Sequence, residues 1–437
     1  MMMRMNLHCE LFRLLPTLIG LVSVLLGAHQ LASAQTVAYT HATVETLSSH
    51  GRLENATILV RSGKIVDVGV DVKIPDEARV VSLMGQTVMP GIIEPYLVYK
   101  RTAVSSEETE TVTFGGRSFQ IPTTRAFNPG SFDTISEYFY PYSFDFLRYV
   151  RAGVATVNLV SDGRGLSAFA DMTVEPSADM LFESNGLLFA RLTNETASID
   201  VIRNPLNPRP TRGAPPTGQT RPGAAATGRP AGAEASASGQ GQEQTPQSGG
   251  ATNANEAQWA EVREGKRALI VNANNAAAVA HLVRILSNQP KVKVVLVVTG
   301  PNVYEALDQI KGTNISLVLK PEIATEPFSA RRTNVAKMAA DRNIPFAFSL
   351  TVGANQLENT WDEPLFPVAS LVKTGLSREL ALAALTSTPA KMLGIENNYG
   401  TIEAGKYANL LIFQGDPLTT GSRLKQVIVK GSSIYAN

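Results

Sequence analysis

The chain has 437 residues, of which 44% are hydrophobic and 18% charged, and its formal charge is +1. This is the composition of a globular protein that is long enough for one large domain and a smaller one. The nearly balanced charge argues against a nucleic-acid or polyanion partner.

Residues 1–34 have the features of a secretory signal peptide. Arg4 and Arg13 precede the apolar run LLPTLIGLVSVLLGA, and Ala32-Ser33-Ala34 supplies small residues before a cleavage point. The alternative is a membrane anchor, but the run is shorter than the roughly 20 residues that a spanning helix needs. We therefore expect cleavage, a secreted and periplasmic protein, and no stable membrane span. Cleavage removes Cys9, the single cysteine, so no disulfide or thiolate metal site is expected.

The two ends of the mature chain are both rich in β-strand patterns. In residues 35–86, the segment Ala56–Gly69 has two alternating runs around Ser62-Gly63, which predicts a hairpin. Residues 399–437 contain the strand-like runs ANLLIF, QVIVKG and SSIYA, separated by glycine-containing turns. We expect these two segments to pair into one small composite β-sandwich.

The middle of the chain, residues 87–204 and 257–398, alternates strands with helices. GVATVNLV is apolar throughout, as in a strand that is buried on both faces. Repeated βα units at this spacing predict an α/β fold with a parallel sheet. We expect a TIM-type (β/α)8 barrel, regular or distorted. The strands expected in the second half are 267–273, 292–298, 315–320 and 344–350, and the helices are 276–287, 302–311, 329–341, 365–375 and 378–387.

Two segments depart from this rhythm. Residues 205–256 contain almost no large apolar side chains, so they cannot bury enough surface to offset the entropy of ordering, and we expect a disordered insert rich in Pro, Gly and Ala. Residues 127–149 concentrate aromatic side chains. These aromatics either line a ligand pocket or pack over the barrel or at an interface.

Two long motifs resemble a known family. LENATILVRSGKIVDVG followed by MGQTVMPGIIEP resembles the first segments of the amidohydrolase superfamily, in particular its secreted imidazolonepropionase-like members. LTSTPAKMLGIENNYGTIEAGKYANLLIFQGDPL resembles their last segments. With AGVATVNLV, the resemblance covers nearly all of the mature chain except the insert. It implies a (β/α)8 barrel with a composite β-sandwich, and metal-assisted hydrolysis of C–N bonds other than peptide bonds.

The family chemistry implies a specific set of ligands. One or two divalent metals, zinc among them, lie at the carboxyl ends of the barrel strands, where they acidify a bound water and polarise the substrate carbonyl. The family pattern has Asp-x-His-x-His after the first strand. In this chain Glu94 replaces the aspartate, while Tyr96 and Val98 replace the histidines. A phenol is a poor ligand at neutral pH, and valine is none.

The later ligand positions of the family are also replaced. Asn272 stands where a histidine is expected after the strand 267–273, Thr299 follows the strand 292–298, and Thr351 stands near the expected aspartate. No good candidate for a bridging lysine is found. The histidines that remain after cleavage are structural or surface residues by position: His41, His50 and His281.

The replacement of the family's metal ligands leaves two functional hypotheses open. A third hypothesis concerns the partners of the protein. The leading one is a non-catalytic protein, with no metal cofactor, that binds a small amide- or peptide-like ligand. The alternative is an active hydrolase of a cyclic amide or peptide-like substrate with a carboxylate metal site of the calcium or magnesium type. The third hypothesis is assembly as a homo-oligomer, or with an active amidohydrolase paralogue through the aromatic segment. The carboxylates available to such a metal site are Glu94, Asp162, Glu322 and Asp362.

Overall fold

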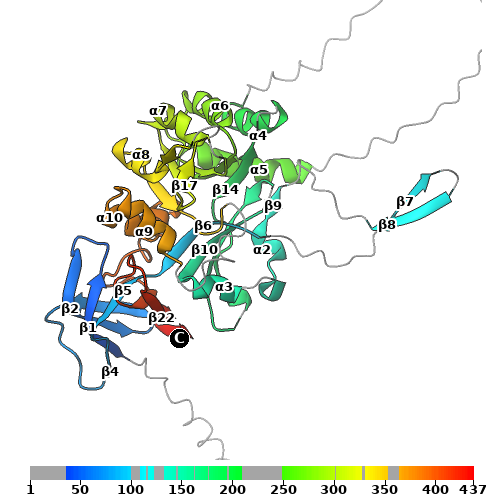
Figure 1. The fold of residues 1–437 in the computed structure, drawn as a ribbon. Helices are drawn as coiled ribbons and strands as arrows, with labels where there is room; N and C mark the ends of the chain where they lie inside the picture. The colour runs from blue at the N-terminus through cyan, green and yellow to red at the C-terminus, as the bar shows by residue number, and fades with distance from the viewer. Residues whose placement is uncertain are drawn as a thin grey trace, which may run out of the picture.

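A computed structural model shows how the strands and helices are arranged (Figure 1). It describes residues 36–99, 109–114, 117–122, 132–143, 146–161, 163–175, 177–193, 196–208, 249–300, 302–326, 330–352 and 364–437. No helix among these residues is long and apolar enough to cross a membrane. The predicted signal peptide lies outside this part of the chain.

The two ends of the described chain form one eight-stranded sheet. Its strand order is β23-β22-β21-β5-β1-β2-β3, with β4 paired to β1, and β5 joins β21 in antiparallel register. Ser62 and Gly63, with φ of 51° and 75°, make the tight turn of the predicted hairpin. The strands are Val37–Glu45 (β1), Arg52–Arg61 (β2), Lys64–Gly69 (β3), Arg79–Ser82 (β4), Gln86–Pro90 (β5), Leu410–Gln414 (β21), Arg423–Val429 (β22) and Ser432–Ala436 (β23).

A bulge in β1 bends this terminal sheet. The first half of β1 pairs in parallel with β4 and its end pairs in parallel with β5, while the register with β2 shifts on both sides of Ala42. His41 lies in this bulge with φ of 60° and an exposed side chain. Ile58, Val88 and Ile412 belong to a small core that the terminal sheet encloses separately from the main one.

The middle of the chain forms two further sheets. One has the order β13-β12-β10-β6, and the other has the order β20-β17-β16-β15-β14-β11-β9. The run from β14 to β20 is parallel, as is the pair β6 and β10. The strands are Ile92–Val98 (β6), Asp133–Thr134 (β9), Val154–Val160 (β10), Gly165–Leu166 (β11), Ala168–Asp171 (β12), Leu181–Glu183 (β13), Leu188–Leu192 (β14), Leu269–Ala273 (β15), Val294–Val298 (β16), Ile315–Leu319 (β17) and Phe346–Phe348 (β20).

The fold is therefore mixed α/β with a β-rich unit, and the predicted parallel strand order is present. The described strands make two sheets rather than one closed sheet. The sheet edges β6 and β20 are bridged by the backbone N–H of Leu350, which follows β20 and donates to Glu94 of β6 over 2.8 Å. Two short pairs complete the described strands: Thr109–Phe114 (β7) with Arg117–Pro122 (β8), and Ala324–Thr325 (β18) with Arg332–Thr333 (β19).

The helices begin where their sequence supplies caps. The side chains of Asn275, Asn334 and Ser377 accept backbone N–H groups at the starts of α6, α8 and α10. The helix predicted at 329–341 therefore starts only after Asn334. The α-helices are Ile135–Tyr138 (α2), Phe146–Arg151 (α3), Thr196–Leu206 (α4), Gly249–Arg263 (α5), Ala276–Leu286 (α6), Leu307–Ile310 (α7), Val335–Asp341 (α8), Phe366–Lys373 (α9), Arg378–Ala383 (α10) and Ser387–Leu393 (α11).

Two sequence-based boundaries need correction. The helix expected at 302–311 is a 3₁₀ turn, Val303–Ala306 (η3), followed by α7. Further 3₁₀ turns are Pro141–Ser143 (η1) and Ala178–Met180 (η2). The insert predicted at 205–256 is shorter at both ends, because α4 runs to Leu206 and α5 begins at Gly249; residues 209–248 lie outside the described part. Composition does not predict the end of α4 or the start of α5, because a helix that packs on a neighbour needs few apolar residues.

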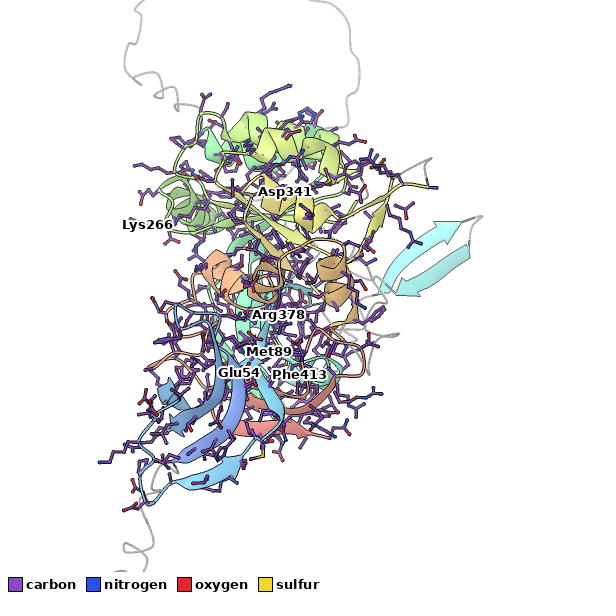
Figure 2. All side chains as sticks on the ribbon, turned by 60° about the vertical axis from the view of Figure 1, so that its left-hand side comes forward. Glu54, Met89, Lys266, Asp341, Arg378 and Phe413 are labelled. Carbon is purple, nitrogen blue, oxygen red and sulfur yellow. The ribbon has the colours of Figure 1, made fainter. Side chains whose placement is uncertain are left out.

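An ion-pair cluster fastens α10 to the terminal sheet. Arg378 on α10 contacts Glu45 of β1 over 2.7 Å and Asp416 over 2.9 Å. Figure 2 labels Arg378 close to Met89 and Phe413, which belong to the terminal sheet and to the main core. The terminal sheet and the βα region are thus joined by both charge and apolar packing.

A second junction is built around the buried carboxylate of Asp171 at the end of β12. It accepts hydrogen bonds from Thr156 over 2.7 Å and from the Tyr399 phenol over 2.8 Å, and it pairs with Lys430 over 2.8 Å. Burial, followed by the charge of Asp171, raises the pKa of Tyr399, so the phenol stays protonated and donates.

We expect Asp171→Ala to lower the free energy of unfolding by about 3 kcal/mol, because it leaves the buried hydroxyl groups of Thr156 and Tyr399 without their acceptor. Urea unfolding at neutral pH measures this loss. Asp76→Ala, at an exposed position of the terminal sheet segment, is the matched control and should change stability by less than about 0.5 kcal/mol. Equal effects of the two substitutions would contradict the role given to Asp171.

Candidate functional site

Glu94 lies on β6, with 0% of its surface exposed. One carboxyl oxygen accepts the backbone N–H of Leu350 over 2.8 Å, and the other accepts that of Tyr96 over 3.2 Å. Burial raises the pKa of Glu94 to about 7, although hydrogen bonds from Ser349, Leu350 and other neighbours lower it in part. Both oxygens are thus directed at the protein's own backbone.

A run of neutral polar side chains starts beside Glu94. The Asn272 amide nitrogen on β15 donates to the Tyr96 phenol oxygen over 2.9 Å, and the Thr299 hydroxyl donates to the Asn272 amide oxygen over 3.1 Å. Thr351 donates to the backbone carbonyl of Tyr96 over 2.7 Å. Residues from four separate strand ends therefore meet in one hydrogen-bonded network.

The structure brings together five of the six positions singled out in the sequence. Glu94, Tyr96, Asn272, Thr299 and Thr351 belong to the network, because the carboxyl ends of neighbouring parallel strands meet at one edge. Val98, at the end of β6, is half-buried and packs against the main core instead.

Ser349 is a member that the sequence reasoning missed. It is fully buried, its hydroxyl lies 3.2 Å from that of Thr351, and it accepts the backbone N–H of Val352 over 3.1 Å. The signal that could have found it is its place at the end of the strand predicted at 344–350, next to Thr351.

A cavity of about 210 Å³ opens beside this network, at the carboxyl ends of β16 and β17. Thr299 forms part of its wall together with Tyr304 and Val352. Lys320 and Glu322 line it as well and form an ion pair with each other. The cavity therefore combines a hydroxyl, a phenol and one pair of opposite charges.

The donor set of the network does not fit a tightly held transition metal. Such ions are coordinated by imidazole, thiolate or free carboxylate groups. Here the Glu94 oxygens already accept backbone N–H groups, and the Asn272 amide is engaged through both of its polar atoms. Within the described ranges, no three His, Cys, Asp or Glu side chains group closely enough to hold a metal ion.

The histidines and the other acidic candidates lie elsewhere. His281 is half-buried on α6, and His41 and His50 are exposed in the terminal sheet segment. Glu322 lines the cavity but is paired with Lys320. Asp162 and Asp362, the remaining members of the hypothetical carboxylate site, lie outside the described residues.

Comparison with known proteins identifies the relationship. Residues 294–434, from the start of β16 into β23, match the model of the amidohydrolase family. An amidohydrolase from Thermotoga maritima MSB8 superposes with a TM-score of 0.67 at 17% identity, over 92% of this chain and 100% of that one. The C-terminal third of the chain is thus similar to the amidohydrolase family. No curated protein matches the sequence.

Two other solved structures have a similar fold. A prolidase in complex with N-methylphosphonate-L-proline gives a TM-score of 0.51 at 12% identity, covering 92% of this chain and 100% of that one. An adenosine deaminase from Xanthomonas campestris with bound zinc gives a TM-score of 0.51 at 13% identity, covering 92% of each chain. At these identities the likeness shows the fold alone.

The buried carboxyl group of Glu94 should make the stability of this protein depend on pH. Because burial raises the pKa of Glu94 from 4.5 to about 7, the folded state holds its proton more tightly than the unfolded state does. Stability from this group is full below pH 4.5 and is lost as the pH rises through about 7, a change of roughly 3 kcal/mol at about 1.4 kcal/mol per pKa unit.

We therefore expect the free energy of unfolding of Glu94→Gln to fall less between pH 5 and pH 8 than that of the unchanged protein. Urea unfolding across this range measures the two slopes. Glu379→Gln, at an exposed position on α10, is the control and should keep the original slope. A Glu94→Gln slope equal to the original would show that Glu94 is not the titrating group.

Proposed function

We propose that the protein is a non-catalytic member of the amidohydrolase superfamily that binds a small amide- or peptide-like ligand. One observation carries this proposal: Tyr96, Asn272 and Thr299, at positions where the family resemblance implies ligating histidines or their neighbours, are hydrogen-bonded to one another. A neutral phenol, an amide and a hydroxyl cannot acidify a water in the way that a bound metal does.

The site has the place expected of a binding site in this architecture. We propose that the two inner sheets are the wall of a distorted (β/α)8 barrel whose edges meet where Leu350 donates to Glu94. Ligands of such barrels bind at the carboxyl ends of the strands. The cavity of about 210 Å³ lies at those ends, and its size suits a dipeptide or a cyclic amide rather than a long chain.

The charges of the cavity indicate which ligands it would take. Lys320 can pair with a ligand carboxylate, Glu322 with an amine, and Thr299 can bond to an amide between them. A dipeptide carries all three groups, and the structurally similar prolidase was solved with a proline-containing compound.

Location and assembly are part of the same proposal. We propose that residues 1–34 direct secretion to the periplasm and are removed. We further propose assembly as a homo-oligomer or with an active paralogue, supported by the exposed Tyr140, Tyr142 and Leu147 of the aromatic segment. Residues 127–131 and 144–145 of that segment lie outside the described part.

We expect the purified protein to contain far less than one zinc, iron or manganese ion per chain, because the donors at the strand ends are neutral or already engaged. Elemental analysis after purification without chelators measures this directly. About one tightly held transition metal per chain would overturn the proposal and favour the alternative of an active hydrolase.

We expect L-alanyl-L-proline to bind without being cleaved, and Lys320→Ala to weaken the binding about fivefold through loss of the contact with the carboxylate. Calorimetry measures the affinity, and chromatography of the incubated dipeptide detects any hydrolysis. Lys311→Ala, at an exposed site that does not line this cavity, is the matched control. Hydrolysis would refute the non-catalytic assignment, and absence of binding would refute the assigned ligand class.

A further inference from the structure

A second and larger cavity, of about 580 Å³, lies at the opposite end of the βα region. Leu187 and Arg267, which line it, lie directly before or close to the starts of β14 and β15. The Glu94 network lies beyond the other ends of the same parallel strands. The volume falls within the range of about 300–1,000 Å³ that is typical of ligand pockets. Nothing in the proposed function accounts for this cavity.

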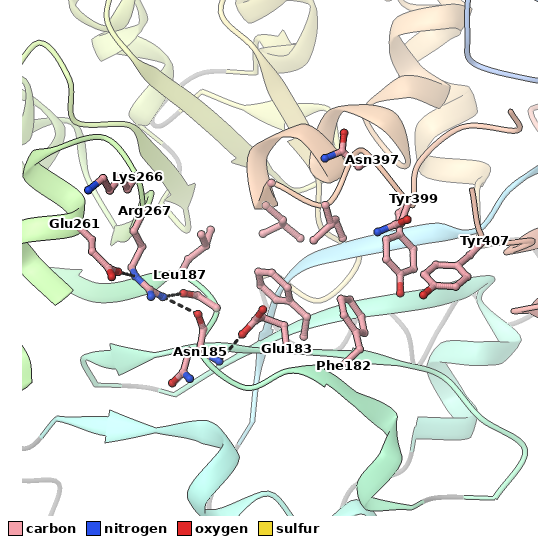
Figure 3. A pocket seen from close by; sticks show the side chains of 16 residues that line it. Phe182, Glu183, Asn185, Leu187, Glu261, Lys266, Arg267, Asn397, Tyr399 and Tyr407 are labelled. Atoms are coloured by element: carbon pink, nitrogen blue, oxygen red, sulfur yellow. Dashed lines mark hydrogen bonds and ion pairs between the residues drawn. The ribbon is translucent and has the colours of Figure 1, made fainter. Parts of the chain in front are cut away.

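One end of the cavity is apolar and aromatic. Figure 3 shows Phe182, Tyr399 and Tyr407 together at this end. Phe182 and Tyr399 stack with ring centroids 5.1 Å apart and an angle of 22° between their planes. Leu393, the last residue of α11, and Ile395, just after it, complete the apolar wall.

The other end carries charge. Arg267 is committed to the fold, since it donates to Glu261 over 2.7 Å and to the backbone carbonyls of Asn185 and Gly186. Lys266 is different: its side chain is 72% exposed, and its ion pair in the described part of the chain is with Glu264, which is itself 56% exposed. Exposed pairs of this kind contribute little, so Lys266 can turn to an incoming anion at small cost.

Polar side chains line the cavity as well. Figure 3 shows Asn185 below the charged group, Asn397 above Phe182, and Glu183 between the charged and the aromatic groups. Asn185, Asn397 and Asn398 are exposed and line the cavity, and each side-chain amide both donates and accepts hydrogen bonds. Such groups match the N–H and C=O groups of a peptide backbone.

We propose that this cavity is a second binding site, for a short peptide with a free C-terminal carboxylate. An apolar side chain near the peptide's N-terminus enters between Leu393, Ile395 and the aromatic edges. The backbone meets the asparagine amides, and the carboxylate pairs with Lys266. The arrangement of apolar, amide and cationic groups along the cavity carries this assignment.

The aromatic geometry disfavours a sugar in the same place. Sugars bind proteins by stacking on open ring faces, but Phe182 and Tyr399 cover one face of each other. The Lys430 ammonium lies over the rings of Phe182 and Tyr407, with distances of 5.6 and 4.9 Å to their centroids. Ring edges, which suit an aliphatic side chain, are what remains for a ligand.

Three probes test the proposal on the full mature protein by calorimetry: N-acetyl-Leu-Gly-Gly, its C-terminal amide, and maltotriose. We expect the free-acid peptide to bind saturably and the amide to bind about fivefold more weakly. Lys266→Ala should reduce the affinity for the acid to that for the amide and leave the amide unchanged. Maltotriose should not bind.

A blocking variant gives an independent test. Gly394 lines the cavity with φ of 75°, and a Cβ at this position would meet only open space. Asparagine tolerates this left-handed conformation, so Gly394→Asn places a side chain into the cavity. The substitution should weaken the binding of both peptides about tenfold or more. Circular dichroism checks its folding, and the comparison of acid with amide in Lys266→Ala stands without it.

Separate variants distinguish the two cavities, which lie at opposite ends of the parallel strands. Lys320→Ala, at the 210 Å³ cavity, should leave binding of the acetylated peptides unchanged, as should Lys311→Ala. No saturable binding of the acid, equal binding of acid and amide, or better binding of maltotriose would each overturn the proposal. The metal content of the protein bears only on the proposed function and not on this site.

Discussion

The arrangement of the strand ends depends on how one buried carboxyl group is satisfied. Glu94 has no exposed surface, and an unpartnered carboxyl group in that position would cost several kcal/mol. Its partners are the backbone N–H groups of Tyr96 on its own strand and Leu350 beyond β20. Because these two donors belong to the edges of different sheets, satisfying the carboxyl group also fixes where β6 lies against β20.

This constraint determines what the neighbouring side chains can do. Tyr96 is held by its backbone contacts with Glu94 and Thr351, and its phenol oxygen is then within 2.9 Å of the Asn272 amide. Asn272 in turn engages Thr299. A closed network of neutral groups gains stability and rigidity from mutual satisfaction. The same satisfaction leaves few lone pairs for a metal ion, so the strand ends are organised for structure and recognition rather than for activating water.

The sequence predicts a large part of this organisation. Alternating patterns and turn residues locate the hairpin at Ser62-Gly63 and the parallel strands from β15 to β20, because strand periodicity and glycine conformation are local properties. The positions of Glu94, Tyr96, Asn272, Thr299 and Thr351 follow from the family resemblance together with the rule that parallel strands end at a common edge.

What the sequence does not predict depends on contacts between distant segments. Ser349 also forms a side-chain hydrogen bond with Glu94, which lies far away along the chain on β6. Asp171, Tyr399 and Lys430 are separated widely along the chain, and no local pattern brings them together at 2.8 Å. The extension of α5 to Gly249 is likewise missed, because this part of the chain has almost no large apolar residues from which a helix could be predicted.

The two ends of the parallel strands differ in a way that follows from the same packing. At the carboxyl ends, polar side chains point toward one another and leave a cavity of about 210 Å³. At the amino ends, the segment after α11 and the β12–β13 pair line a cavity of about 580 Å³. Tyr399, which also lines this cavity, donates a hydrogen bond to Asp171. Tyr407, which lines the larger cavity, also forms an isolated β-bridge with Lys64 of β3, so a ligand in that cavity would lie beside the terminal sheet as well.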